Sequence, residues 1–185
     1  MLHPRWVVTT KAALAKLENR RESGLAFRGD TESATFGCLD KRIADVAAAS
    51  FEELVVGCQT TFTRTVDVAD VELFAEVTGD NDPIHVDDAY AATTPYGKRI
   101  AQGALVVGYM MAASTQMTYG IPAGAASVGF DRIRHVAPVF CGDTLTVRYE
   151  IISRDEDRRR AVAGISVDNQ DGETVAVANH ILKVF

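Results

Sequence analysis

One short stretch of the sequence brings together two side chains that can exchange protons near neutral pH. Asp80 and His85 lie five residues apart on one loop. Gly79 ends the predicted helix before this loop, and Pro83 stiffens the loop itself. A carboxylate and an imidazole on one rigid loop can hold a water molecule between them, which suits general acid–base catalysis. The spacing alone also allows an alternative without chemistry, in which Asp80 caps a turn and His85 is a structural loop histidine.

A second candidate element follows eighteen residues after His85. Gly103 stands where a strongly apolar helix is predicted to begin. The first N–H groups of a helix have no partner within it, and the helix dipole adds partial positive charge there. A carbonyl oxygen that gains negative charge would be stabilised at this point, and glycine permits its close approach, so Gly103 outlines an oxyanion hole. The alternative is an ordinary glycine at the start of a helix.

Hydrophobic periodicity predicts the elements that would hold these residues. We expect a strand over 60–66, a helix over 68–78 capped by Asp67, a loop at 80–85, a short helix over 87–92 and an apolar helix over 103–117. Four further strands are predicted over 125–136, 145–151, 160–167 and 174–184. The long helix is apolar on nearly all sides and should be buried. The order predicts an α+β fold in which a curved antiparallel sheet wraps around this central helix.

Composition and charge exclude several classes of protein. The chain has 185 residues, 47% of them apolar, which fits one globular domain and a modest appendage. We expect an N-terminal appendage over 1–49, with helices at 12–17 and 39–49 and a loop at 24–37, followed by the main domain over 50–185. The net charge is −6, with +2 in the appendage and −8 in the main domain. This acidic domain argues against sequence-independent nucleic-acid binding.

Cysteine spacing and hydropathy point to a soluble protein of a reducing compartment. The three cysteines, Cys38, Cys58 and Cys141, are far apart and form no C-x-x-C pair, so we expect neither a zinc site nor a disulfide framework. The longest strongly apolar run, 104–113, is about half the length of a membrane span. Residues 1–5 lack the apolar core of a signal peptide. We therefore expect a cytoplasmic protein with no membrane partner.

The residues around Asp80 resemble a family motif. The run Gly79–Asp87, G-D-N-D-P-I-H-V-D, is similar to the hydratase-2 motif G-D-x-N-P-[LI]-H-x-D of MaoC-like dehydratases, the (R)-specific enoyl-CoA hydratases. The run Ile100–Gly103, I-A-Q-G, resembles the I-A-H-G that follows in that family, and the lead-in over 51–57 is also similar. The resemblance covers Ser50 to Phe185.

This resemblance implies a fold and a mechanism. The fold would be the hot-dog fold, and the reaction would add water to trans-2-enoyl-CoA, or remove it from (R)-3-hydroxyacyl-CoA. The implied catalytic residues are Asp80 and His85, which would grip the water, and Gly103, whose N–H would hold the thioester oxygen. The residues that we expect to contact substrate are Asp82, Pro83, Arg99 and Gln102. No metal or separate cofactor is implied, because CoA enters as part of the substrate.

Two positions depart from the family pattern. Asp82 replaces the motif's asparagine, and Gln102 replaces the usual histidine. Asp82 either places a second negative charge beside Asp80, which would raise the pKa of one carboxylate, or it hydrogen-bonds the loop backbone as an Asx turn, which we favour. Gln102 neighbours the proposed oxyanion donor, so we expect glutamine in place of histidine here to affect which substrate is preferred.

Other functions and roles stay open at this point. The alternatives are a hot-dog acyl-CoA thioesterase, which would hydrolyse the thioester, and a non-catalytic acyl-CoA-binding paralogue. The histidines outside the motif, His135 and His180, fall within predicted strands, and we interpret both as structural. A single curved sheet leaves exposed edges, so we expect a homodimer or a higher homo-oligomer.

Overall fold

The computed structural model describes residues 48–185. The predicted appendage therefore lies outside the described residues, except for its last two positions. The described elements in chain order are a 3₁₀ turn at Phe51–Glu53, β1 (Gln59–Thr65), α3 (Val68–Thr78), α4 (Pro83–Val86), α5 (Asp88–Ala91), α6 (Gly103–Thr118), β2 (Ala125–His135), β3 (Thr144–Asp155), β4 (Arg160–Asp168) and β5 (Thr174–Val184). None of the helices in this range combines the length and hydropathy needed to span a bilayer.

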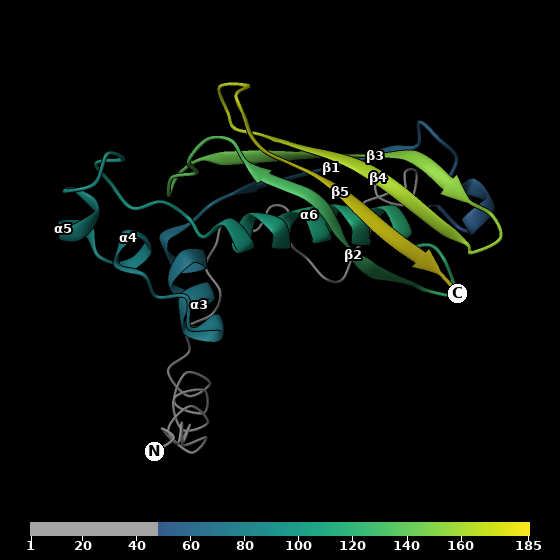
Figure 1. The fold of residues 1–185 in the computed structure, drawn as a ribbon, viewed down its shortest axis with the longest axis horizontal. Helices are drawn as coiled ribbons and strands as arrows, with labels where there is room; N and C mark the ends of the chain where they lie inside the picture. The colour runs from purple at the N-terminus through teal and green to yellow at the C-terminus, as the bar shows by residue number, and fades with distance from the viewer. Residues whose placement is uncertain (1–47) are drawn as a thin grey trace, which may run out of the picture. The chain divides into compact units, whose positions relative to one another are not determined.

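The five strands form one antiparallel sheet with the order β1-β3-β4-β5-β2. Helix α6 runs along one face of this sheet, and the short helices α4 and α5 lie beyond its N-terminal end (Figure 1). The sheet order leaves β1 and β2 as edge strands. The predicted α+β arrangement, an antiparallel sheet packed around one long apolar helix, is confirmed.

The alternation of side chains along the inner strands builds the core against α6. Buried residues alternate with more exposed ones along β3, β4 and β5, as expected for a sheet with one covered face. One polar network lies in this core: the Tyr149 hydroxyl is 2.8 Å from Nδ1 of His180, and Nε2 of His180 is 2.9 Å from Oγ of Ser127. Burial lowers the pKa of His180 to about 4. This histidine therefore joins β3, β5 and β2 inside the core, which fits the expected structural role.

Helix α6 is buried on one side only. Its sheet-facing residues, among them Val106, Met110 and Ala113, are buried, whereas Ala104 and Gly108 are exposed. The expectation of a buried helix therefore holds, within residues 48–185, for the side of α6 that packs against the sheet. The sheet covers only one face of the helix, and the opposite stripe carries small residues.

The loop predicted at 80–85 is shorter than expected, because helix α4 begins inside it. Pro83 is the first residue of α4, where its missing N–H costs nothing and its fixed φ favours the helix. The Asp82 side chain accepts a hydrogen bond from the Ile84 N–H at 3.1 Å and so caps the turn. The preferred interpretation of Asp82 as an Asx turn is thereby confirmed. His85 lies on a helical turn and not in an irregular loop.

Candidate active site

A four-residue segment, 100–103, connects the parts of the candidate site. It is fixed by backbone pairing: the Ala101 N–H donates to the Val139 carbonyl at 2.7 Å, and Ile100 forms a β-bridge with Phe140. The Ile100 N–H also donates to the Ile84 carbonyl at 3.3 Å, which attaches α4 to the segment. Helix α6 then begins at Gly103. Main-chain hydrogen bonds therefore hold this segment in place.

His85 is oriented by this segment. Its Nδ1 lies 2.7 Å from the carbonyl oxygen of Ile100. A carbonyl can only accept, so Nδ1 must carry a proton and donate it, and in the neutral ring the lone pair is on Nε2. The imidazole is half-buried, which leaves part of it accessible. His85 therefore presents Nε2 as a nitrogen that can take or return a proton.

Asp80 is held through its backbone, while its side chain is exposed. Helix α3 ends at Gly79, whose left-handed conformation (φ 81°) turns the chain. The Asp80 N–H donates to Oγ1 of Thr78 at 3.2 Å, and the Asp80 carbonyl accepts from Nε2 of Gln102 at 3.3 Å. Gln102 itself is fully buried. Its side chain contacts the Asp80 backbone, and its expected contact with substrate stays a prediction.

The start of α6 is where the sequence predicts an oxyanion hole. The first two N–H groups of the helix, at Gly103 and Ala104, have no hydrogen-bond acceptor among residues 48–185. Gly103 also touches a residue that sequence reasoning treated as structural: a Cβ built at 103 would lie 2.7 Å from Nε2 of His135. His135 is exposed at the end of β2. Its imidazole therefore borders the free N–H groups of α6.

The remaining predicted substrate contacts have other partners in the structure. Asp82 and Pro83 form the start of α4, and both are exposed. Arg99 is largely buried, and its guanidinium pairs with Asp88 at 2.8 Å and with Glu72 at 3.5 Å. It therefore braces α5 against α3, and its expected contact with substrate stays a prediction.

The far end of α3 is also braced. Asp70, in its first turn, accepts from Arg64 of β1 at 2.7 Å and from the Tyr109 hydroxyl of α6 at 3.2 Å. Burial, with the charge of Asp70, raises the pKa of Tyr109 to about 12, so this phenol stays protonated as a donor. The helix that ends beside Asp80 is thus attached to both the sheet and α6.

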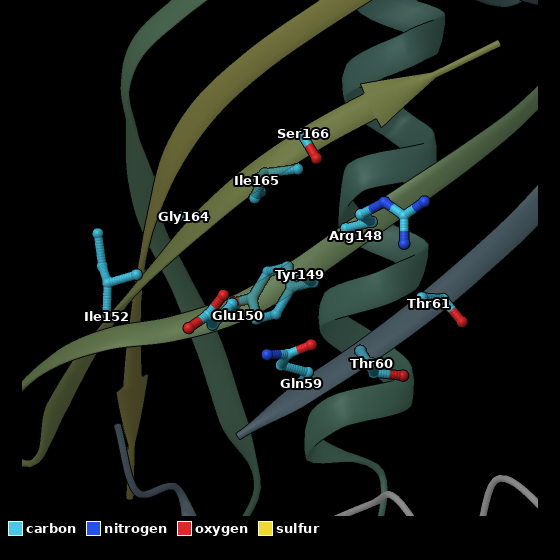
Figure 2. A pocket seen from close by; sticks show the side chains of 10 residues that line it. All are labelled: Gln59, Thr60, Thr61, Arg148, Tyr149, Glu150, Ile152, Gly164, Ile165 and Ser166. Atoms are coloured by element: carbon cyan, nitrogen blue, oxygen red, sulfur yellow. The ribbon is translucent and has the colours of Figure 1, made fainter. Parts of the chain in front are cut away.

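A hollow of about 270 Å³ lies elsewhere, on the sheet (Figure 2). Its rim includes the exposed side chains of Gln59, Thr61, Arg148 and Glu150, which alternate with buried neighbours and so mark the face away from α6. None of its lining residues belongs to the predicted site. Within 48–185, no three His, Cys, Asp or Glu side chains are grouped so that they could hold a metal ion.

Comparison with known proteins identifies relatives of this chain. The family model described as "MaoC like domain" matches residues 53–174. A 3-hydroxybutyryl-CoA dehydratase of Methylorubrum extorquens is 36% identical over 111 residues, which cover 60% of this chain and 69% of that protein. An (R)-specific enoyl-CoA hydratase of Aeromonas caviae is 27% identical over 135 residues, covering 73% of this chain and 98% of that protein.

A solved structure extends the comparison to the fold. The R-hydratase of Pseudomonas aeruginosa, in its unliganded form, superimposes with a TM-score of 0.67 at 32% identity and covers 74% of this chain and 85% of that one. The antiparallel sheet around α6 is therefore the hot-dog fold, as the sequence resemblance implied. Since the family model spans well over half of the sequence, the chain belongs to the MaoC-like dehydratase family.

Proposed function

We propose that this protein is a hydro-lyase that interconverts trans-2-enoyl-CoA and (R)-3-hydroxyacyl-CoA. The observation that carries the proposal is the hydrogen bond from Nδ1 of His85 to the Ile100 carbonyl, since it leaves Nε2 free beside the segment that starts α6. Family membership and the names of the relatives, a dehydratase and two hydratases, support the same chemistry.

In the proposed mechanism, Asp80 and His85 hold one water molecule. One of these groups removes a proton from the water while the water oxygen bonds to C3 of the enoyl thioester. The electron pair of the double bond moves towards the thioester oxygen, where the N–H of Gly103 stabilises the developing charge. The other group, which starts protonated, delivers its proton to C2, and the proton taken from the water passes between the two groups to restore them, so H and OH have been added across the double bond. The reaction itself calls for no redox partner, and we propose that it needs no separate cofactor.

The test is a spectroscopic assay of crotonyl-CoA with the purified chain. We expect loss of the enoyl absorbance without release of free CoA, and chiral analysis should show the (R) product. Asp80→Asn and His85→Ala should each lower kcat by orders of magnitude with the fold intact by circular dichroism. CoA release at the rate of substrate loss would favour the thioesterase. Binding without turnover of any enoyl-CoA would favour the non-catalytic paralogue.

We also propose that the protein forms a homodimer or a higher homo-oligomer in the cytoplasm. Edge strand β2 has no neighbour on one side in the sheet order, and its Val128 side chain is exposed. Light scattering on the active protein tests this proposal, and a monomer at assay concentrations would refute it. The free thiols of Cys58 and Cys141 fit a reducing compartment.

A further inference from the structure

We propose that Gln102 is a positioning residue for Asp80, and that it acts by tying the Asp80 backbone to both α3 and the start of α6. This inference rests on the proposed function, in which Asp80 contacts the catalytic water. Gln102 is the residue before α6, so its own backbone is continuous with the proposed oxyanion donor at Gly103. One side chain would thus set the distance between the acid–base loop and the oxyanion hole.

The hydrogen bonds of Gln102 carry the proposal. Its Nε2 donates to the carbonyl of Val71, the fourth residue of α3, at 3.1 Å, and to the carbonyl of Asp80 at 3.3 Å. These two carbonyls are nine residues apart, so they can share one nitrogen only because the chain turns back at Gly79. These two hydrogen bonds therefore fix the position of the Asp80 backbone relative to α3.

Glutamine is suited to this task by its donor count. A side-chain amide carries two N–H bonds on one nitrogen and can serve two carbonyls, whereas each imidazole nitrogen carries at most one. The orientation follows from the acceptors, because a flipped amide would point Oε1 at two carbonyl oxygens. The Oε1 atom is buried and has no partner among the described residues. Within 48–185, both hydrogen bonds of this side chain are therefore made by its nitrogen.

The cost of losing these bonds should appear in catalysis more than in binding. Displacing a catalytic group by about 1 Å can lower a rate on the order of 100-fold, since the reacting atoms must be in near-attack geometry. The thioester oxygen and the CoA moiety would still meet Gly103 and the surface around it. We therefore expect Gln102→Met, which matches the length of the side chain but cannot donate, to lower kcat and leave KM nearly unchanged.

The experiment is a double-mutant cycle on the full chain, with crotonyl-CoA as substrate and mass-spectrometric detection of product. The proteins are wild type, Gln102→Met, Asp80→Asn and the double variant. Gln116→Met is the matched control, because Gln116 lies on the same helix, about 20 Å further along the axis, and its buried Oε1 also has no partner within residues 48–185. Melting temperatures are measured for all five proteins.

We expect Gln102→Met to lower kcat about 10- to 100-fold with KM within about 3-fold, and to add less than about 2-fold once Asp80 is already Asn. The control should keep wild-type kcat. A wild-type kcat in Gln102→Met, or the same fold-loss in both backgrounds, would overturn the inference. If Gln102→Met does not fold, Gln102→Asn, whose shorter side chain cannot reach both carbonyls, enters the same cycle under the same criterion. A wild-type protein that hydrates no enoyl-CoA would instead overturn the proposed function.

Discussion

Replacing Gly103 by alanine tests the oxyanion hole separately from the stability of the fold. The added Cβ would lie 2.7 Å from Nε2 of His135 and 3.0 Å from both adjacent ring carbons, closer than van der Waals contact allows. The His135 ring is exposed and can move away, at a cost of about 0.5–1.5 kcal/mol for an off-rotamer side chain. Alanine in a helix gains up to about 1 kcal/mol over glycine. The two contributions nearly cancel, so the free energy of unfolding should change little.

Activity should respond very differently. The methyl group and the displaced imidazole would both crowd the free N–H groups at the start of α6, where we place the thioester oxygen. Loss of one oxyanion donor lowers kcat on the order of 100- to 1,000-fold, and we expect a fall of that size for Gly103→Ala. The assay is crotonyl-CoA hydration, alongside a denaturant titration that reports the free energy of unfolding.

Gly108→Ala is the control for this prediction. Gly108 lies on the same helix, is exposed, and a Cβ built there meets nothing within 4 Å. It should therefore stabilise the protein by up to about 1 kcal/mol and leave kcat unchanged. Near wild-type hydration by Gly103→Ala, with the variant folded, would refute the assignment of the oxyanion hole to this amide.

Three further outcomes follow from the structure. Burial lowers the pKa of His180 to about 4 from 6.5, so the unfolded chain binds this proton more readily. The free energy of unfolding should then fall by up to about 3 kcal/mol as pH drops from 6.5 towards 4, and urea titrations across that range should show a weaker dependence in His180→Gln. Dialysis against EDTA should leave the hydration rate unchanged, because the proposed steps use only Asp80, His85, Gly103 and water; a rate restored by added metal would contradict them. Asp82→Asn should keep the α4 cap and activity within about 3-fold, whereas Asp82→Ala should cost about 1 kcal/mol in thermal melts.

The elements that depend on local sequence pattern could be predicted well. Helix α3 was expected over 68–78 with Asp67 before it and Gly79 after it, and the structure has those bounds. Strand β5 also matches its expected range, 174–184. Each of these elements carries its own periodicity and its own end signals, so no long-range information was needed.

The errors have equally local causes. Pro83 was expected to stiffen a loop, but proline is tolerated at the first position of a helix, and α4 begins there. The burial of α6 was overestimated on the side away from the sheet. An apolar composition shows that a helix face can be buried, but it does not show which part of the chain covers that face. The ion pairs of Arg99 were not expected, because its acidic partners lie on α3 and α5, away from it in the sequence; its contact with substrate stays a prediction.

The contacts of Gln102 and His135 could not have been predicted from spacing. Gln102 bonds to carbonyls 31 and 22 residues away. His135 reaches Gly103 only because β2, at the edge of the sheet, ends beside the start of α6. Sequence motifs find residues that act from one loop, and they miss residues that approach the same point from a distant strand or helix.

The candidate site therefore depends on backbone pairing first and on side chains second. The bonds from Ile100 to Ile84 and from Ala101 to Val139 use main-chain groups, so the position of segment 100–103 does not depend on which side chains it carries. His85 of α4 and His135 of β2 reach this segment, and Gln102 extends from it to α3. Glutamine can therefore stand in place of the family's histidine at 102, provided that its side chain still hydrogen-bonds to the Asp80 backbone. For the same reason, the choice of residue at 102 should affect the rate of the chemical step more than the stability of the fold.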